Sequence, residues 1–397
     1  IMFLRPRKFG KTLFTSVLEY YYDKNQIDKF EKLYGKTYIG KNPTKSKNSY
    51  CILRFNFSGI DTSSEEATIK GFKNEVASSI EVFKCRYDVD FYVNKEDDAE
   101  NILNNLFKAF YVQKAQEKIY VIIDEYDHFA NELLGFNPEQ FRALVSKNGK
   151  VRKWYEILKK GTETVVDRIF ITGVAPITLD SLTSGFNIGT DITQDVRFNE
   201  MMGFTKNELI EILNSQDILK EEQEQILPIM KENYDGYKFS LEAKNQIYNS
   251  NMCLYFLNRY IEFGKIPTKL IDVNIASDYS KIGKMLGLCK GENRLEILRK
   301  TVQGEPINNN IVEKFNPAIE FNETDMISML YYLGYLTIFG EDLGMPELTI
   351  PNKVMKEIYA DYFMQLMNQE ADFRIDNTRN QEILREIARE GKIDKMV

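Results

Sequence analysis

The sequence predicts an α/β fold in which a parallel sheet is covered by helices on both faces. Short runs rich in β-branched and aromatic residues lie at 1–4, 50–59, 118–127 and 168–177. The last three do not alternate cleanly between polar and apolar residues, which is typical of strands buried on both faces. Helical segments separate these runs, and this alternation predicts strand–helix–strand crossovers. The helical segments span residues 12–23, 64–87 and 99–118.

After about residue 203 the sequence favours helices. Thr205 with Glu208 three positions later is a capping-box pattern, and mostly helical sequence continues to Tyr260 around a turn at 233–240. Residues 324–363 predict helix, strand, glycine turn, strand and helix. A winged-helix-like module fits this order, and a generic helical cap with a hairpin fits it equally well. The expected domains are a core at 1–203, a helical lid at 204–300, a winged-helix-like module at 301–371 and a charged helical tail at 372–397.

Composition excludes several classes of protein. Hydrophobic residues make up 43% of the 397 residues, which is enough for buried cores and excludes a disordered chain. The net charge of −7 does not indicate a nucleic-acid coat, although it leaves room for a local basic site. With His128 the only histidine, sites that need several imidazoles are not expected. The four cysteines lack CxxC pairing and indicate neither a zinc site nor a disulfide framework; they are Cys51, Cys85, Cys253 and Cys289.

The expected location is a reducing cytoplasm. No uninterrupted run of about 18 apolar residues is present, so we expect no membrane span, and nothing at the start resembles a signal peptide. Because only four residues precede the basic loop described next, we expect the core to extend beyond Ile1.

The stretch RPRKFGKT, residues 5–12, resembles a phosphate-binding loop with one atypical position. The pattern G-x-x-x-x-G-K-[ST] ends correctly at Gly10, Lys11 and Thr12, but Arg5 replaces its first glycine. Gly10 would allow close backbone approach, Lys11 would contact phosphate, and Thr12 would bind Mg²⁺ at a helix N-terminus. A basic surface turn before a helix is the alternative. The residues expected to contact nucleotide are Arg7, Lys8, Phe9, Gly10, Lys11, Thr12 and Leu13 of this loop, together with Arg197 further along the chain.

A pair of acids ends the third apolar run. In YVIIDEYDHF, Asp124 at the tip of a strand would hold Mg²⁺, and Glu125 would orient and deprotonate a water molecule. A strand that merely ends in a polar turn is the alternative. Asp127 fits a cap of the following segment better than a site acid, and we expect His128 to be structural.

Further site residues are expected on the fourth run and after it. Thr172 in RIFITGVAPI is the candidate for sensing the terminal phosphate, with a buried threonine bonded to backbone as the alternative. Arg197 in DVRFNEMMGFT is the candidate for reporting nucleotide state, and Arg168 is its rival. An exposed arginine without a role is the alternative for both.

Taken together, the chain resembles the AAA-ATPase-like proteins of bacteria and archaea, which often carry a C-terminal PD-(D/E)XK nuclease-like domain. The resemblance extends to about residue 365, and the family loop commonly has arginine where Arg5 stands. It implies a P-loop NTPase core of three layers, with ATP and Mg²⁺ as cofactors. The segments that carry it are FLRPRKFGKTLFTSVLEYYY, VIIDEYDHF, ITGVAPITLDSLTSGFNIGTDIT, RFNEMMGFTKNEL, YDGYKFS, LGYLTI and LTIPNKVMKEIY.

The resemblance also sets the functional alternatives. The family's nucleotide-binding residues fall on Gly10, Lys11, Thr12, Asp124 and Glu125. No nuclease signature follows residue 365, so nuclease activity is not carried over, although a nuclease-like domain or another protein remains an expected partner. The leading hypothesis is an ATPase that hydrolyses the β–γ bond. The alternatives are a nucleotide-regulated scaffold and a nucleic-acid binder acting near Lys353 and Lys356.

Overall fold

The computed structural model describes residues 1–128, 149–177, 189–271, 297, 299–301, 303–315 and 322–370, with side chains described as far as 362. The expected charged tail at 372–397 lies outside the described residues. The strands are β1 (Met2–Leu4), β2 (Cys51–Asn56), β3 (Ile119–Asp124), β4 (Val166–Gly173), β5 (Ile307–Asn308), β6 (Thr337–Asp342) and β7 (Met345–Thr349). The α-helices are α1 (Lys11–Tyr22), α2 (Phe30–Tyr34), α3 (Tyr38–Lys41), α4 (Glu65–Tyr87), α5 (Ala99–Gln113), α8 (Lys150–Gly161), α10 (Lys206–Ser215), α11 (Lys220–Tyr234), α12 (Ser250–Phe263), α16 (Glu323–Tyr332) and α17 (Lys353–Glu370). Two 3-10 helices, η1 (Lys24–Lys29) and η2 (Val196–Phe198), complete the set.

The main sheet has four strands in the order β1-β4-β3-β2, and every neighbouring pair is parallel. The four predicted strands are therefore confirmed. β4 lies between β1, which precedes the basic loop, and β3, which ends in Asp124. Because all four strands run in the same direction, the loop after β1 and the acids after β3 meet at one edge of the sheet. This parallel sheet is compatible with the P-loop fold that the resemblance implies.

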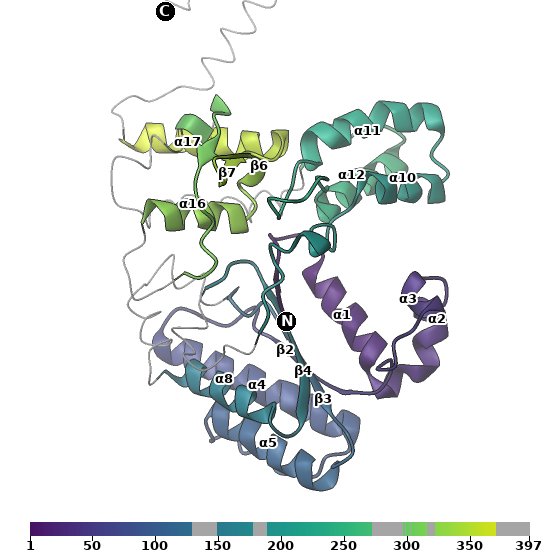
Figure 1. The fold of residues 1–397 in the computed structure, drawn as a ribbon, viewed down its shortest axis with the longest axis vertical. Helices are drawn as coiled ribbons and strands as arrows, with labels where there is room; N and C mark the ends of the chain where they lie inside the picture. Colours follow the sequence, from purple (N-terminus) through teal and green to yellow (C-terminus); the bar gives the residue numbers. More distant parts are fainter. Residues whose placement is uncertain are drawn as a thin grey trace, which may run out of the picture.

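Helices cover the sheet on both faces (Figure 1). Neighbouring residues of a strand point to opposite faces, and β2 shows the consequence. Arg54 bonds to Ser16 and Glu19 of α1, whereas Phe55 packs edge-on against Trp154 of α8. Helices α4, α5 and α8 pack on one another on the Trp154 side.

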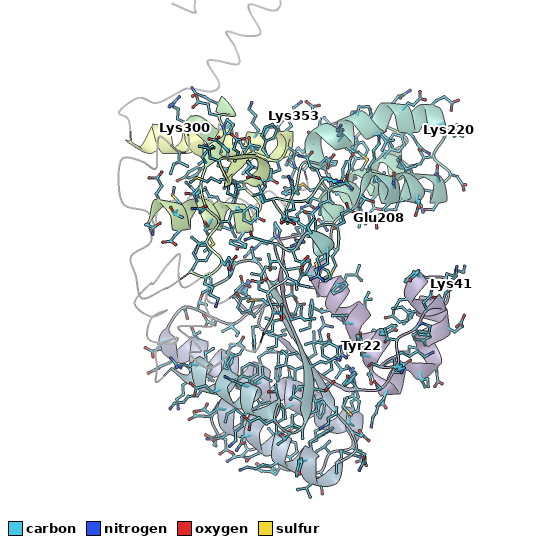
Figure 2. All side chains as sticks on the ribbon, in the orientation of Figure 1. Tyr22, Lys41, Glu208, Lys220, Lys300 and Lys353 are labelled. Atoms are coloured by element: carbon cyan, nitrogen blue, oxygen red, sulfur yellow. The ribbon has the colours of Figure 1, made fainter. Side chains whose placement is uncertain are left out.

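Aromatic rings fill both layers between sheet and helices. On the α8 face, Trp154 is fully buried and contacts Phe57 and Phe72 as well as Phe55. On the α1 face, the ring of Tyr22 lies 5.1 Å from that of Tyr120. Figure 2 shows side chains filling the space between the helices and the sheet, with Tyr22 labelled on α1. This packing explains the absence of polar alternation in the strands.

The second half forms the elements that the sequence predicts. Thr205 and Glu208 make the expected capping box at the start of α10. Helix α16, strands β6 and β7, and helix α17 follow in the expected order, and β5 adds a third strand beside β7. The division into lid and winged-helix-like modules stays a prediction. Among the described helices, none is both long enough and apolar enough to span a membrane.

Candidate functional site

The basic loop ends at a position whose backbone conformation favours glycine. Gly10 has φ of 91° and caps the N-terminus of α1, which begins at Lys11. A side chain at Gly10 would have space, because a Cβ would meet only Ser250 Oγ at 3.9 Å, so the constraint is the left-handed backbone. The first turn of α1 contains no acidic residue. Its free N–H groups and dipole therefore form an anion-binding end.

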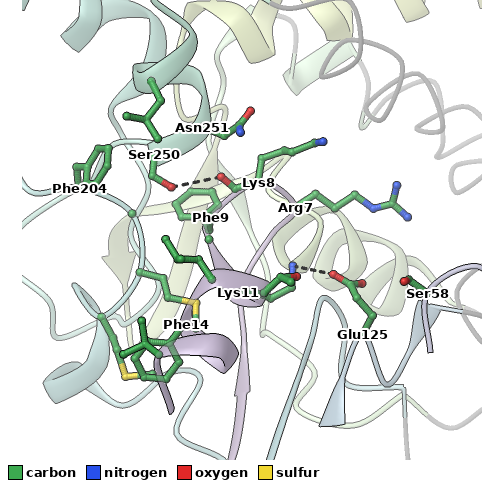
Figure 3. A pocket seen from close by; sticks show the side chains of 18 of the residues that line it. Arg7, Lys8, Phe9, Lys11, Phe14, Ser58, Glu125, Phe204, Ser250 and Asn251 are labelled. Carbon is green, nitrogen blue, oxygen red and sulfur yellow. Dashed lines mark hydrogen bonds and ion pairs between the residues drawn. The ribbon is translucent and has the colours of Figure 1, made fainter. Parts of the chain in front are cut away.

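Lys11 and Glu125 face one another at this end of the sheet (Figure 3). Lys11 Nζ lies 3.6 Å from Glu125 Oε1 and donates to the Pro6 carbonyl at 3.2 Å. Glu125 has φ of 52°, a left-handed conformation that is uncommon outside glycine. Since successive strand residues point to opposite faces, this turn at Glu125 lets its carboxylate reach the cavity beside the loop.

Asp124 is fully buried beside α1. Its Oδ2 accepts a hydrogen bond from Thr15 Oγ1 at 3.4 Å. Burial raises the pKa of Asp124, and the neighbouring charge of Glu125 raises it further. Asp124 Oδ1 has no hydrogen-bond partner, and neither has Thr172 Oγ1 on the adjacent strand. Buried polar atoms without partners are uncommon, and no protein group among the described residues competes for these two oxygens.

These oxygens fit Mg²⁺. The hydroxyl of Thr12 and the carboxylate of Asp124 are hard ligands of the kind that Mg²⁺ prefers, with phosphates and water usually completing the shell. In the part of the chain that the structure describes, no group of three or more His, Cys, Asp or Glu side chains is arranged to hold a metal by protein ligands alone. The metal would therefore bind together with phosphate.

A cavity of about 780 Å³ opens over the loop and the start of α1. This volume suits a nucleotide-sized ligand. One side is basic, with Arg7, Lys8 and Lys11, and the other is largely apolar. Its lining comprises Arg7, Lys8, Phe9, Gly10, Lys11, Thr12, Leu13, Phe14, Val17, Asn56, Ser58, Glu125, His128, Met201, Met202, Gly203, Phe204, Ser250, Asn251 and Leu254.

The N-terminus of α12 closes this cavity from the helical region. Ser250 Oγ and the backbone N–H of Asn251 lie 3.4 Å and 3.3 Å from the Lys8 carbonyl, and both donate to it. Two helix N-termini, those of α1 and α12, thus meet at the basic loop. Both dipoles favour an anion there.

The geometry agrees with what comparison with known proteins finds. A family model described as a predicted AAA-ATPase matches the N-terminal part of the chain. Residues 1–183 match the AAA-ATPase-like family. Curated proteins and solved structures yielded no match. The matched residues include the basic loop, both acids and all four strands of the main sheet.

Within the matched residues, the atypical Arg5 does not line the cavity. It is buried between the rings of Phe3 and Phe239, with its Cζ 4.1 Å and 4.2 Å from their centroids. Its guanidinium donates to backbone carbonyls of Leu4, Thr193, Phe198 and Asn199. Burial lowers the pKa of Arg5 to about 9. Arg5 therefore fastens β1 to the segment before the helical region.

Phe9 packs against Phe239, as Arg5 does, and we call these contacts of Arg5 and Phe9 with Phe239 the clamp. Its ring is buried and packs edge-on against Tyr237 and Phe239, at centroid distances of 4.9 Å and 5.5 Å. The ring lies against the helical region, although Phe9 belongs to the residues that line the cavity. The expected contact of Phe9 with nucleotide stays a prediction.

The remaining candidate residues differ in whether they lie at the cavity. Arg197 is exposed, forms an ion pair with Asp195 and is not part of the cavity lining. Arg168 lies at the opposite end of β4 from Thr172 and bonds to Tyr50 Oη at 2.9 Å. Asp127 is buried and accepts from the N–H groups of Val174 and Ala175, so it holds the end of β4. His128 lies on the cavity lining.

Sequence reasoning missed several residues of the lining, among them the polar residues Asn56, Ser58, Ser250 and Asn251. Asn56 is the register partner of Asp124 on the neighbouring strand and accepts from the Ser58 N–H. A signal existed for these two, since polar residues follow an apolar strand in FNFSG. No local signal existed for Ser250 and Asn251, because only the folded chain brings α12 to the loop.

Proposed function

We propose that the chain binds ATP together with Mg²⁺ and hydrolyses its β–γ phosphate bond. The observation that carries this proposal is the meeting of Lys11 and Glu125 at one cavity of about 780 Å³, next to the buried Asp124, whose Oδ1 has no hydrogen-bond partner. This arrangement combines an anion-binding helix end with oxygen ligands for a hard cation.

Each side chain has a defined task in this proposal. Lys11 and the amides of the loop hold the phosphates and neutralise charge that develops on them. Thr12 and Asp124 would hold Mg²⁺, which would neutralise negative charge on the phosphates. Glu125, released from Lys11, accepts a proton from the attacking water. Thr172 orients the terminal phosphate from the strand between β1 and β3.

The apolar side of the cavity provides a place for the base. Met201, Met202, Phe204 and Leu254 line it on the helical region, and Leu13 lines it on α1. Leu13 is 71% exposed, which fits a surface that a flat ring would cover. Arg197 is not part of this lining, so its proposed role is to report nucleotide state from outside the cavity.

The nucleotide state is proposed to reposition the helical and C-terminal modules. Support comes from the clamp formed by Arg5 and Phe9 on Phe239, and from Pro6, which a Cβ at Gly334 would approach to 2.7 Å. A movement of the loop on binding would therefore be felt on both the 237–239 turn and the segment after α16.

A nucleotide-regulated scaffold with negligible turnover is the second candidate. It is favoured by the ion pair between Lys11 and Glu125, which engages the proposed base with the proposed phosphate ligand. A nucleic-acid role for the module near Lys353 has less support. Lys353 pairs with Glu232, and the adjoining hairpin carries Glu341, Asp342 and Glu347 without a basic residue.

Calorimetric titration with ATP and with GTP, each with Mg²⁺ and with EDTA, tests the proposal. Wild type should bind ATP in the presence of Mg²⁺, and Lys11→Ala should lose at least about 100-fold in affinity, because a buried cation facing phosphate is removed. Arg168→Ala, which removes a cation from the opposite end of the sheet, is the matched control and should bind as wild type does. Equal binding by Lys11→Ala and wild type would refute the site.

A further inference from the structure

A cation outside the loop lies directly against Asp124. Arg54 projects from β2 toward α1, and its Nη2 is 3.6 Å from Asp124 Oδ2. Asp124 is fully buried, whereas Arg54 is 26% exposed. This oxygen also accepts from Thr15, while the second oxygen of the carboxylate has no partner.

Arg54 is held in this position by α1. Its Nη2 donates to Thr15 Oγ1 at 3.0 Å, and its Nη1 donates to Ser16 Oγ and Glu19 Oε2 at 3.2 Å and 3.1 Å. Glu19 lies on the same face of the helix as Thr15 and Ser16, because it follows them by four and three positions. The guanidinium is therefore fixed by hydrogen bonds on one side and faces Asp124 on the other.

The charges continue away from the site with alternating sign. Glu19 also pairs with Arg86 at 2.6 Å, and Arg86 pairs with Asp23 at 3.4 Å. A second cavity, of about 340 Å³, lies along Arg54 and Arg86 and leaves the Arg54 side chain space to move away from Asp124.

We propose that Arg54 is the counter-ion of Asp124 in the metal-free chain and that it weakens metal binding at this carboxylate. The inference rests on the proposed function, since it assumes that Asp124 holds Mg²⁺ beside a nucleotide. Two cations next to one carboxylate repel each other, so the metal binds against the charge of Arg54. Arg54 neutralises part of the negative charge of Asp124, so this carboxylate alone attracts the metal weakly. The phosphates of the nucleotide supply the missing negative charge, and metal binding therefore depends on the nucleotide.

The test measures how much Mg²⁺ strengthens nucleotide binding. The dissociation constant of the β,γ-imido analogue of ATP is determined by calorimetry with Mg²⁺ and with EDTA. The constant in EDTA divided by the constant in Mg²⁺ is the ratio that is compared between variants, so a higher ratio means that Mg²⁺ strengthens binding more. Removing a positive charge also weakens binding of the anionic nucleotide itself. Because this loss of affinity occurs in both buffers, it cancels in the ratio. Arg54→Gln should raise the ratio about tenfold. Arg54→Lys, which keeps the charge, should stay within about twofold of wild type.

Arg86→Gln is the matched control, because it removes the same charge from the same chain of ion pairs without touching Asp124. Its ratio should equal that of wild type. Thermal melts establish that each variant is folded, and Arg54→Met replaces Arg54→Gln if the latter unfolds. An unchanged or lower ratio in the neutral Arg54 variant overturns the inference while leaving the proposed function intact. Failure of wild type to bind the analogue in either buffer overturns both.

Discussion

At the scale of single residues, the site combines groups that are poorly satisfied without a ligand. Asp124 is buried with one oxygen unpartnered, Thr172 has an unpartnered hydroxyl, and Glu125 adopts a left-handed backbone conformation. Each of these features costs folding free energy. Such costs concentrate at functional sites, where replacing the functional residue often stabilises the chain.

Asp124→Asn should therefore raise the free energy of unfolding by about 1 kcal/mol at neutral pH in the absence of nucleotide. Burial raises the pKa of Asp124. A carboxyl with a raised folded pKa contributes stability below its unfolded pKa and loses it as pH rises through the folded pKa. The advantage of Asp124→Asn should thus be small below about pH 4 and should grow above it. Asp127, whose pKa is also raised by burial, titrates in both proteins and cancels in the difference.

Urea denaturation of both proteins between acidic and neutral pH measures this difference. An advantage of Asp124→Asn that does not change with pH would contradict the assignment of a buried, ionisable carboxylate at this position.

Arg5 is the second residue with a sharp expectation. Its planar guanidinium bonds to several carbonyls in different directions and stacks between two rings, a geometry that an ammonium group does not reproduce. Arg5→Lys should destabilise the chain by roughly 2–4 kcal/mol in denaturant unfolding. Arg168→Lys at the exposed end of β4 should change stability by less than about 0.5 kcal/mol. Equal effects of the two substitutions would contradict the clamp.

At the scale of elements, the turn between α11 and α12 is locked against the start of α17. Gly236 has φ of 101°, and a Cβ there would lie 2.0 Å from the Pro351 carbonyl oxygen. The Asn352 side chain donates to the Asp235 carbonyl at 2.9 Å. The segments YDGYKFS and LTIPNKVMKEIY, which are far apart in the sequence, therefore form one joint.

Two glycines with positive φ test this joint against backbone strain alone. Gly264 ends α12 with φ of 64° and has no atom within 4 Å of a built Cβ. Gly264→Ala should cost about 1 kcal/mol from strain. Gly236→Ala carries the same strain plus a backbone clash, so it should cost about 3 kcal/mol or more. Chemical denaturation of both variants measures the difference, and similar losses would show that the joint is loose.

At the scale of the whole molecule, the basic loop contacts the cavity through some of its residues and the helical region through others. Gly10 and Lys11 face the cavity, whereas Arg5 and Phe9 are packed on Phe239 of the helical region. Any ligand that orders the loop should also order that region, because binding and packing act on the same residues.

Hydrogen exchange measures this coupling. Mg²⁺ with ATP should slow amide exchange in residues 234–240 as well as in the loop, and the effect should vanish in Lys11→Ala. Exchange at the start of β4, at the opposite end of the sheet, serves as the internal control and should not change. Protection confined to the loop would contradict the coupling.

How far the sequence predicts this molecule depends on the range of the interactions. The strands, the capping box of α10 and the order of α16, β6, β7 and α17 follow from local patterns and are confirmed. The convergence of Lys11 with Glu125 follows from strand direction once the sheet is parallel. The buried role of Arg5 and the arrival of Ser250 and Asn251 at the loop do not follow, since they depend on contacts between distant segments that no local pattern encodes.

Single-turnover hydrolysis of ATP labelled on the γ-phosphate tests the central claim most directly. Wild type with Mg²⁺ should release labelled phosphate, and Glu125→Gln should bind ATP with similar affinity but hydrolyse it at least about 100-fold more slowly, because the general base is lost. Unchanged hydrolysis in Glu125→Gln would contradict the assignment of the base. Tight binding without hydrolysis in wild type would contradict the ATPase itself and favour the nucleotide-regulated scaffold.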